Sequence, residues 1–155
     1  MSPGIGELIP LNFIPISEKL RRWVEEPHEK NNKYPEHLIH KALSGNHVRS
    51  KSEVLIDMFL CKNKIPFRYE CLLQLGAISL YPDFTIRHPI TGKEFYWEHL
   101  GRMDDPGYSN NACLKLQTYM ANGIIPNINL IITCETKECP LDPEMVEKII
   151  EYFFL

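Results

Sequence analysis

The sequence predicts an α/β (α+β) fold in which a mixed central sheet is flanked by helices. After residue 45, the spacing of apolar residues gives the order helix, three strands, helix, strand, helix. Strands that follow one another directly can pair as an antiparallel meander, whereas a strand reached through a helix can lie parallel to its neighbour. This αβββαβ order therefore predicts a three-layer domain with a mixed sheet.

Residues 1–45 are predicted to form an arm with short helices, and residues 46–155 to form the main domain. Turn residues at 44–46 and a change of composition place the boundary between them. Residues 1–16 combine Pro and Gly with isolated apolar side chains, which indicates an irregular segment that packs onto another surface. A second subunit is one such surface, and the protein would then be a homodimer through this arm.

Helix and strand boundaries follow from capping residues, prolines and the period of the apolar residues. The predicted helices span about residues 17–26, 34–43, 50–65, 108–122 and 144–154. The predicted strands span about residues 67–75, 78–87, 94–100 and 129–133. The side chains of the last helix that we expect to face inward are Met145, Ile149, Tyr152 and Phe153.

The hairpin over residues 78–101 carries the most informative acidic residues. Pro and Gly in the turn at 89–92 predict strands that pair symmetrically about it, which places Asp83 directly opposite Glu98. Opposed side chains have Cβ atoms about 5 Å apart, so the carboxylates repel unless a cation lies between them. A bulge at Gly92 would shift this register by one residue. The alternative is that Asp83 and Glu98 are two solvated acids. Both residues lie within apolar sequence, however, and an acid buried there needs a metal or a partner charge.

The composition is ordinary for a globular protein, and the net charge of −3 gives no general attraction to nucleic acid or to an acidic membrane. Binding of a polyanion would therefore need a local basic patch or bound cations. The cysteines include no Cys-x-x-Cys, which argues against a zinc site. Their odd number, five, predicts reduced, buried thiols in a cytoplasmic protein. No apolar run approaches the length of about 18 residues expected of a membrane-spanning helix.

Residues 46–155 resemble the core of the PD-(D/E)XK nuclease superfamily, which has a restriction-endonuclease-like fold. The matching residues are Glu53 on the first helix of the domain, Pro82-Asp83 on the second strand and Glu98 on the third. A Pro-Asp pair alone is common in loops, but three acids on these elements in this order form a far more specific pattern. The resemblance implies a nuclease that hydrolyses DNA with metal-activated water.

One position departs from the family pattern, because the lysine expected on the third strand would fall at Leu100. In some members of the superfamily the following helix supplies this lysine instead. Lys115 and Tyr119 lie one turn apart on that helix. The resemblance therefore implies that Lys115 is the migrated catalytic lysine and that Tyr119 supports it, while a solvated lysine is the alternative.

The resemblance also implies a bound Mg²⁺ or Mn²⁺, because hard oxygen ligands favour these ions. The implied metal ligands are the carboxylates of Glu53, Asp83 and Glu98 and the backbone carbonyl of His99, whose side chain should point away from the metal. Asp83 and Glu98, with Lys115, would be the catalytic residues.

Arg49 and Lys51 directly precede the helix that carries Glu53, and we expect them to contact nucleic-acid phosphates, although ordinary solvated charge is an equally open alternative. The whole pattern predicts a divalent-metal-dependent DNA endonuclease. Leu100 keeps open a catalytically inactive nuclease-fold module that binds nucleic acid or a protein partner. An unrelated α/β interaction module with solvated acids is a third reading, and the choice between DNA and RNA stays open.

Overall fold

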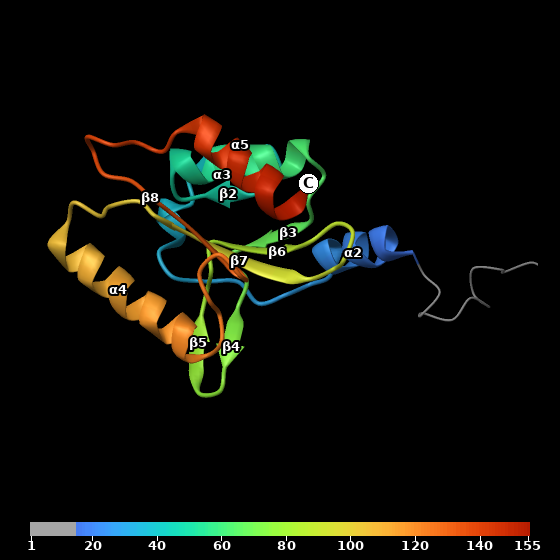
Figure 1. The fold of residues 1–155 in the computed structure, drawn as a ribbon, viewed down its shortest axis with the longest axis horizontal. Coiled ribbons are helices and arrows are strands. Elements are labelled where there is room, and N and C mark those ends of the chain that lie inside the picture. Colours follow the sequence, from blue (N-terminus) through green and yellow to red (C-terminus); the bar gives the residue numbers. More distant parts are fainter. Residues whose placement is uncertain (1–14) are drawn as a thin grey trace, which may run out of the picture.

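The structure is a computed structural model, and it describes residues 15–155 (Figure 1). The helices are α2 (Ile16–Glu25), α3 (Lys51–Lys62), α4 (Pro106–Ala121) and α5 (Pro143–Phe154), together with the short 3₁₀ helix η2 (Pro35–His37). The strands are β1 (His40–Lys41), β2 (His47–Val48), β3 (Phe67–Tyr69), β4 (Leu73–Leu75), β5 (Ile78–Leu80), β6 (Phe84–Arg87), β7 (Glu94–Leu100) and β8 (Leu130–Cys134).

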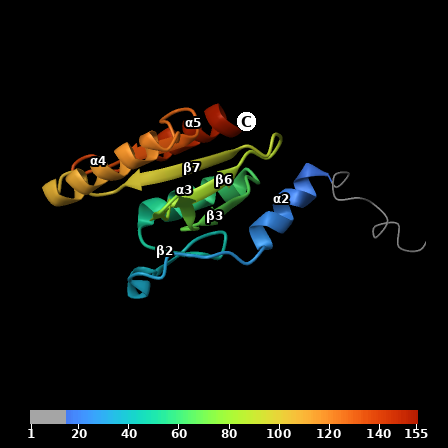
Figure 2. The ribbon, with the colours of Figure 1, turned by 90° about the horizontal axis from the view of Figure 1, so that it is seen from below.

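A four-stranded mixed sheet in the order β3-β6-β7-β8 forms the centre of the domain. β3, β6 and β7 pair antiparallel, and β8 pairs parallel with β7 after the helical crossover through α4. α3 and α5 lie together on one face of the sheet, and α4 lies on the other (Figures 1 and 2). The predicted fold class, a mixed central sheet flanked by helices, is confirmed.

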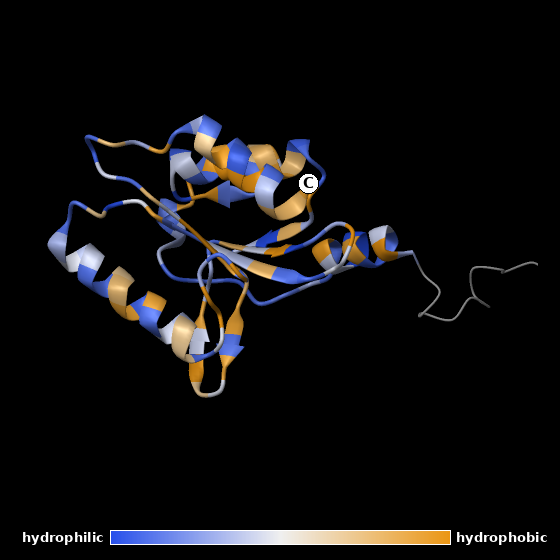
Figure 3. Ribbon diagram, in the orientation of Figure 1, coloured by the Kyte–Doolittle hydropathy of each residue, from blue (hydrophilic) through white to orange (hydrophobic). Residues whose placement is uncertain are grey.

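Each face of the central sheet has its own apolar core, because side chains alternate along a strand. Trp97 of β7 belongs to the core under α3 and α5, whereas its neighbour Tyr96 packs with Tyr119 of α4. Figure 3 shows apolar residues concentrated along β8 and on α3 and α5. The alternation continues along β7, so that Glu98 faces α4 and His99 faces the opposite side.

Capping residues set the first turns of α3 and α4. Oγ of Ser50 accepts the N–H of Glu53 at 3.2 Å and satisfies a donor that has no partner within the helix. α4 begins slightly earlier than predicted, at Pro106, because the side chain of Asp105 caps it. Both helices start near the carboxyl-terminal end of β7, because α4 follows β7 closely in the chain and Ser52 of α3 hydrogen-bonds Glu135, whose N–H donates to the carbonyl oxygen of Leu100.

Two predicted strands are wrong in extent. The strand predicted over 67–75 ends at Tyr69, because Glu70 adopts a positive φ of 47° and turns the chain. The strand predicted over 78–87 breaks at Pro82, which has no N–H for a ladder. The intervening β4 and β5 form a separate two-stranded hairpin.

The helix predicted over residues 34–43 is also wrong. Only η2 is helical there, and β1 then pairs with β2 in a short hairpin. Tyr34, at the start of η2, has a left-handed backbone with φ 51° and makes no side-chain capping bond. A single uncapped turn cannot offset the cost of starting a helix, so the chain continues into extended structure.

The inward face predicted for α5 is correct in part, because Ile149 and Phe153 are partly buried and pack against the core. Met145 and Tyr152 are 55% and 77% exposed, whereas the buried residues of this helix are Val146, Ile150 and Phe154. Apolar residues occupy adjacent positions along α5, so its periodicity alone does not determine which side is buried.

The burial predicted for the cysteines is wrong for Cys113, Cys134 and Cys139, which are exposed, and correct for Cys71. All five cysteines are free thiols. None of the helices within residues 15–155 has the length and apolar character needed to cross a bilayer.

The described part of the N-terminal arm packs onto the domain. Trp23 of α2 lies against the guanidinium carbons of Arg68 and Arg87, which are 4.5 and 4.4 Å from the centre of its ring. Such cation–π contacts stabilise by about 0.5–1 kcal/mol when exposed and more when desolvated. The irregular segment predicted over residues 1–16, with its dimer contact, lies almost wholly outside the described residues.

Candidate functional site

Three acidic residues form a row across neighbouring strands of the central sheet. The observed pairing of Phe84 with Trp97 is the predicted hairpin register, and one further step along it places Asp83 opposite Glu98. β3 pairs on the other side of β6, and the N–H of Glu70 donates to the carbonyl oxygen of Asp83 at 3.0 Å. Asp83 therefore lies between the other two acids.

His99 orients Asp83 through its backbone. Its N–H donates to Oδ2 of Asp83 over 2.7 Å. Its side chain points to the opposite face, as expected, where Nδ1 lies 2.8 Å from Oγ1 of Thr133 and Nε2 lies 2.6 Å from Oε1 of Glu135. The buried imidazole thus fastens the end of β7 while the main chain of the same residue binds the central acid.

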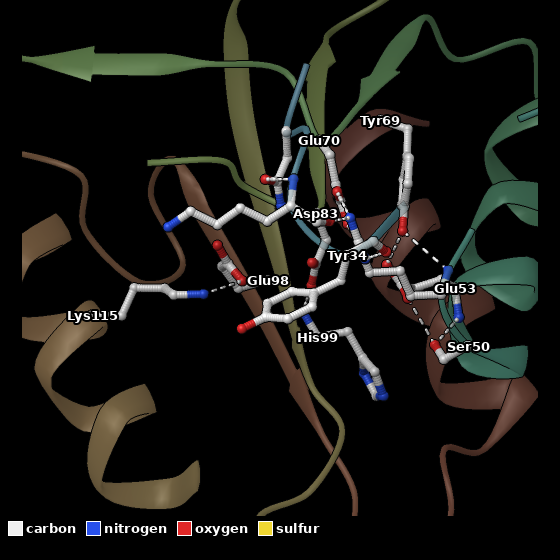
Figure 4. Close-up of polar contacts among 12 residues, drawn as sticks. Tyr34, Ser50, Glu53, Tyr69, Glu70, Asp83, Glu98, His99 and Lys115 are labelled. Carbon is white, nitrogen blue, oxygen red and sulfur yellow. Dashed lines mark hydrogen bonds and ion pairs between the residues drawn. The ribbon is translucent and has the colours of Figure 1, made fainter. Parts of the chain in front are cut away.

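Glu53 approaches this row from the first turn of α3. Its Oε2 accepts the hydroxyl of Tyr69 at 2.8 Å, and its Oε1 accepts the hydroxyl of Ser50 at 2.9 Å. Carboxylate oxygens of Glu53, Glu70 and Asp83 all lie within 4.8 Å of one another (Figure 4). Opposite ligands of Mg²⁺ at about 2.1 Å are about 4.2 Å apart, so this acidic triad fits a small divalent cation with little movement.

Glu70 is the member of the acidic triad that sequence reasoning missed. It occupies one polar position in an apparently alternating strand, yet its side chain is only 7% exposed and its φ is 47°. A buried acid and a strained backbone are each typical of functional sites. The signal that could have identified Glu70 from the sequence is the expected pairing of the first and second strands of the domain. This pairing places Glu70 beside Asp83.

Arg49 holds Glu70 in place. Its Nε and Nη2 donate to the two carboxylate oxygens of Glu70 at 2.6 and 3.0 Å. Nη1 and Nη2 also donate to the carbonyl oxygens of Tyr34 and Lys33 at 2.8 and 2.7 Å. The guanidinium for which we expected a phosphate contact is therefore engaged within the protein, whereas Lys51 is exposed on the first turn of α3.

Glu98 is held by two residues of α4. Its Oε1 accepts the hydroxyl of Tyr119 at 2.6 Å, and Nζ of Lys115 lies 3.5 Å from its Oε2 (Figure 4). The structure thus brings Lys115 and Tyr119 to the row of acids, as the sequence predicts. Burial raises the pKa of Glu98, and the ammonium of Lys115 and the hydroxyl of Tyr119 oppose that rise. Glu98 lies outside the acidic triad.

Comparisons with known proteins identify no family for this chain. No family model, curated protein or solved structure matches it. The resemblance to the PD-(D/E)XK superfamily therefore depends on the order of the elements and on the residues of the site.

The charges of the site do not cancel. Two of the four acids have a cationic partner, and the ion pairs are Arg49 with Glu70 and Lys115 with Glu98. Within residues 15–155, no Lys, Arg or His forms an ion pair with Glu53 or Asp83. When both are ionised, the site keeps two negative charges, which one divalent cation would neutralise.

The unpaired acids have raised pKa values. Burial raises the pKa of Asp83 well above its ordinary value, and repulsion by Glu98 and Glu53 raises it further. Burial also raises the pKa of Glu53, and this effect outweighs the hydrogen bonds from Tyr69 and Ser50. A cation bound between the two carboxylates would favour their charged forms and offset both shifts.

Proposed function

We propose that the protein is a metal-dependent nuclease of the PD-(D/E)XK superfamily that hydrolyses phosphodiester bonds of DNA in the cytoplasm. The observation that carries this proposal is an acidic triad in which Glu53 and Asp83 have no cationic partner among the described residues, next to Glu98 and the ammonium of Lys115. The αβββαβ order of the domain supports it. The free thiols of the protein fit a reducing compartment such as the cytoplasm.

Glu53, Glu70 and Asp83 would hold Mg²⁺ or Mn²⁺, which prefer carboxylate oxygens as ligands. Such an ion, when bound, lowers the pKa of a water ligand and neutralises the charge that develops on the phosphate. Glu98 and the carbonyl of His99, the other ligands that the resemblance implies, follow along β7. Asp83 lies next to all of these groups, so we expect it to be indispensable.

Lys115 acts as a fixed positive charge. Burial lowers its pKa, but attraction by Glu98 and Asp83 outweighs burial, so that the pKa is raised and the ammonium stays protonated at neutral pH. A protonated lysine cannot take a proton from water. It can stabilise the negative charge on the scissile phosphate or orient the attacking water through its N–H groups. We therefore assign Lys115 an electrostatic role.

The decisive experiment compares wild type with Asp83→Asn on supercoiled plasmid and on single-stranded DNA, with Mg²⁺ or Mn²⁺. The substitution keeps the shape of the side chain but removes a charge that holds the metal, so cleavage should fall at least about 100-fold. Glu147→Gln is a matched control, because it removes one exposed carboxylate from α5 and should leave cleavage unchanged. Equal cutting by wild type and Asp83→Asn would exclude this site.

A catalytically inactive nuclease-fold module is the second candidate, and Leu100 favours it because the family pattern has a lysine at that position. Leu100 is buried and cannot replace a charged group. Such a module would bind nucleic acid or a protein partner. It would cut neither DNA nor RNA with Mn²⁺, while Mn²⁺ would still raise its melting temperature through the acidic triad.

A further inference from the structure

Tyr34 is a strained aromatic residue beside the acidic triad. Its backbone is left-handed, with φ 51° and ψ 54°, and the residue is 64% exposed. This conformation costs a residue with a Cβ atom roughly 1–2 kcal/mol. An exposed ring contributes little to a core that would offset this strain, and strained positions of this kind concentrate at functional sites.

Two sets of hydrogen bonds fix Tyr34 next to Glu70. Arg49, which binds the carboxylate of Glu70, also donates to the carbonyl oxygens of Tyr34 at 2.8 Å and of Lys33 at 2.7 Å. The N–H of Asn31 donates to the carbonyl oxygen of Glu70 at 3.0 Å. The loop that carries Tyr34 is thus fastened to the acidic triad through a side chain and through the backbone.

The ring of Tyr34 is also held in a defined orientation. His37 stacks on it, with ring centres 5.5 Å apart and planes inclined by 9°. In the close-up view, the ring is drawn over the space between the labelled side chains of Glu98 and Glu53 (Figure 4). An exposed, oriented aromatic ring is a stacking surface for a nucleobase, and such stacking is worth about 1–3 kcal/mol per base.

We propose that Tyr34 stacks on an unpaired base of a nucleic acid whose phosphate lies at the acidic triad. This inference rests on the proposed function and specifies its substrate as single-stranded DNA or DNA with an unpaired base near the scissile bond. Bases of an intact duplex already stack on one another, and extruding one costs a few kcal/mol. The exposed Lys33 next to Tyr34 adds a positive charge for the phosphate backbone.

The experiment measures fluorescence anisotropy of two labelled strands of about 20 nucleotides. One strand is oligothymidine, and the other has the same phosphates with abasic tetrahydrofuran residues in place of nucleosides. Ca²⁺ replaces Mg²⁺, and a gel verifies that the strands stay intact. Wild type should prefer the strand with bases by about 5- to 150-fold, the equivalent of one stacked base.

Tyr34→Gly removes the ring and suits a positive φ, so this variant should fold at least as well as wild type. It should bind both strands equally, and a thermal melt checks its fold. Tyr34→Phe keeps the ring and should keep the preference. Tyr152→Ala is the control for the loss of an exposed tyrosine and should keep the preference for the strand with bases. Alanine is used rather than glycine because position 152 lies within α5, where glycine would weaken the helix.

Equal binding of both strands by wild type, no binding of either, or a preference that survives in Tyr34→Gly would each overturn the stacking role. A protein-binding role for Tyr34 predicts the first of these results. Cleavage assays with Mg²⁺ separate this outcome from the proposed function. A wild type that cuts DNA without preferring bases overturns stacking alone, whereas a Tyr34-dependent preference without cutting supports stacking and overturns the nuclease.

Discussion

Lys115 and Tyr119, one turn apart on α4, contact the two oxygens of a single carboxylate, that of Glu98. This arrangement joins the fold to the site, because the same contacts that fasten α4 to the sheet also fix an acid next to Asp83. The half-buried lysine and the fully buried tyrosine both hold Glu98 from α4.

Tyr119→Phe should lower the free energy of unfolding by about 1.5–3 kcal/mol, since it leaves a buried carboxylate without its hydrogen bond. Urea denaturation of both proteins at neutral pH measures the change. Tyr152→Phe is the control, because Tyr152 is 77% exposed and the loss of its hydroxyl should have no effect. Equal stability of Tyr119→Phe and wild type would show that this hydrogen bond does not contribute to stability.

Arg49→Ala should destabilise the protein by about 3 kcal/mol, because it leaves the carboxylate of Glu70 buried without its partner charge. Urea denaturation again provides the measurement. The double variant Arg49→Ala/Glu70→Gln should recover part of this loss, since it removes the unpaired charge as well. A double variant whose loss equals the sum of the two single losses would contradict the proposed coupling of these side chains.

The metal-free protein should be more stable at pH 5 than at pH 8. Asp83 and Glu53 have raised pKa values in the folded state, so the folded protein binds more protons than the unfolded chain does at pH values above their ordinary pKa of about 4. The free energy of unfolding should therefore fall as the pH rises from about 4 through the raised values.

Urea denaturation in the presence of EDTA tests this pH dependence. Asp83→Asn should show a shallower fall, because it removes one of the acids whose raised pKa values cause it. Addition of Mn²⁺ should stabilise wild type more at pH 8 than at pH 5, since protonated carboxylates bind metal poorly. A free energy of unfolding that rises with pH in EDTA would contradict the raised pKa values.

The sequence predicts the hairpin register and the helices around it because these features depend on local signals. Pro and Gly in the turn centre the hairpin, and alternation along β7 sets the faces of Glu98 and His99. The i, i+4 spacing of Lys115 and Tyr119 likewise places both on one side of α4. Each of these relationships depends on residues that are close in the sequence or are joined by one hairpin.

Contacts between distant segments account for what the sequence does not predict. The position of Glu70 beside Asp83 depends on which strand β3 joins, and its burial depends on Arg49. The direction of Arg49 depends in turn on carbonyl oxygens in the loop of Tyr34. The buried side of α5 is set by its packing on α3 and the sheet, which the run of apolar residues in that helix does not specify.

Metal titration distinguishes the acidic triad from the ligand set that the family resemblance implies. Glu70 belongs to the triad, whereas the resemblance assigns Glu98 instead. Although Arg49 binds both oxygens of Glu70, a carboxylate offers about four lone-pair sites, so that metal and guanidinium can bind it together. Glu70→Gln should therefore weaken Mn²⁺ binding at least about 10-fold, which corresponds to about 1.4 kcal/mol.

Glu98→Gln should weaken Mn²⁺ binding less, because Glu98 lies outside the triad and is already bound by Lys115 and Tyr119. Isothermal titration calorimetry gives the affinities, and Glu147→Gln controls for the loss of one negative charge. Melting temperatures give an independent measure, because saturation at 100 times the dissociation constant stabilises a protein by about 2.7 kcal/mol. A larger loss of affinity in Glu98→Gln than in Glu70→Gln would make Glu98 the ligand and leave Glu70 as the anchor of Arg49.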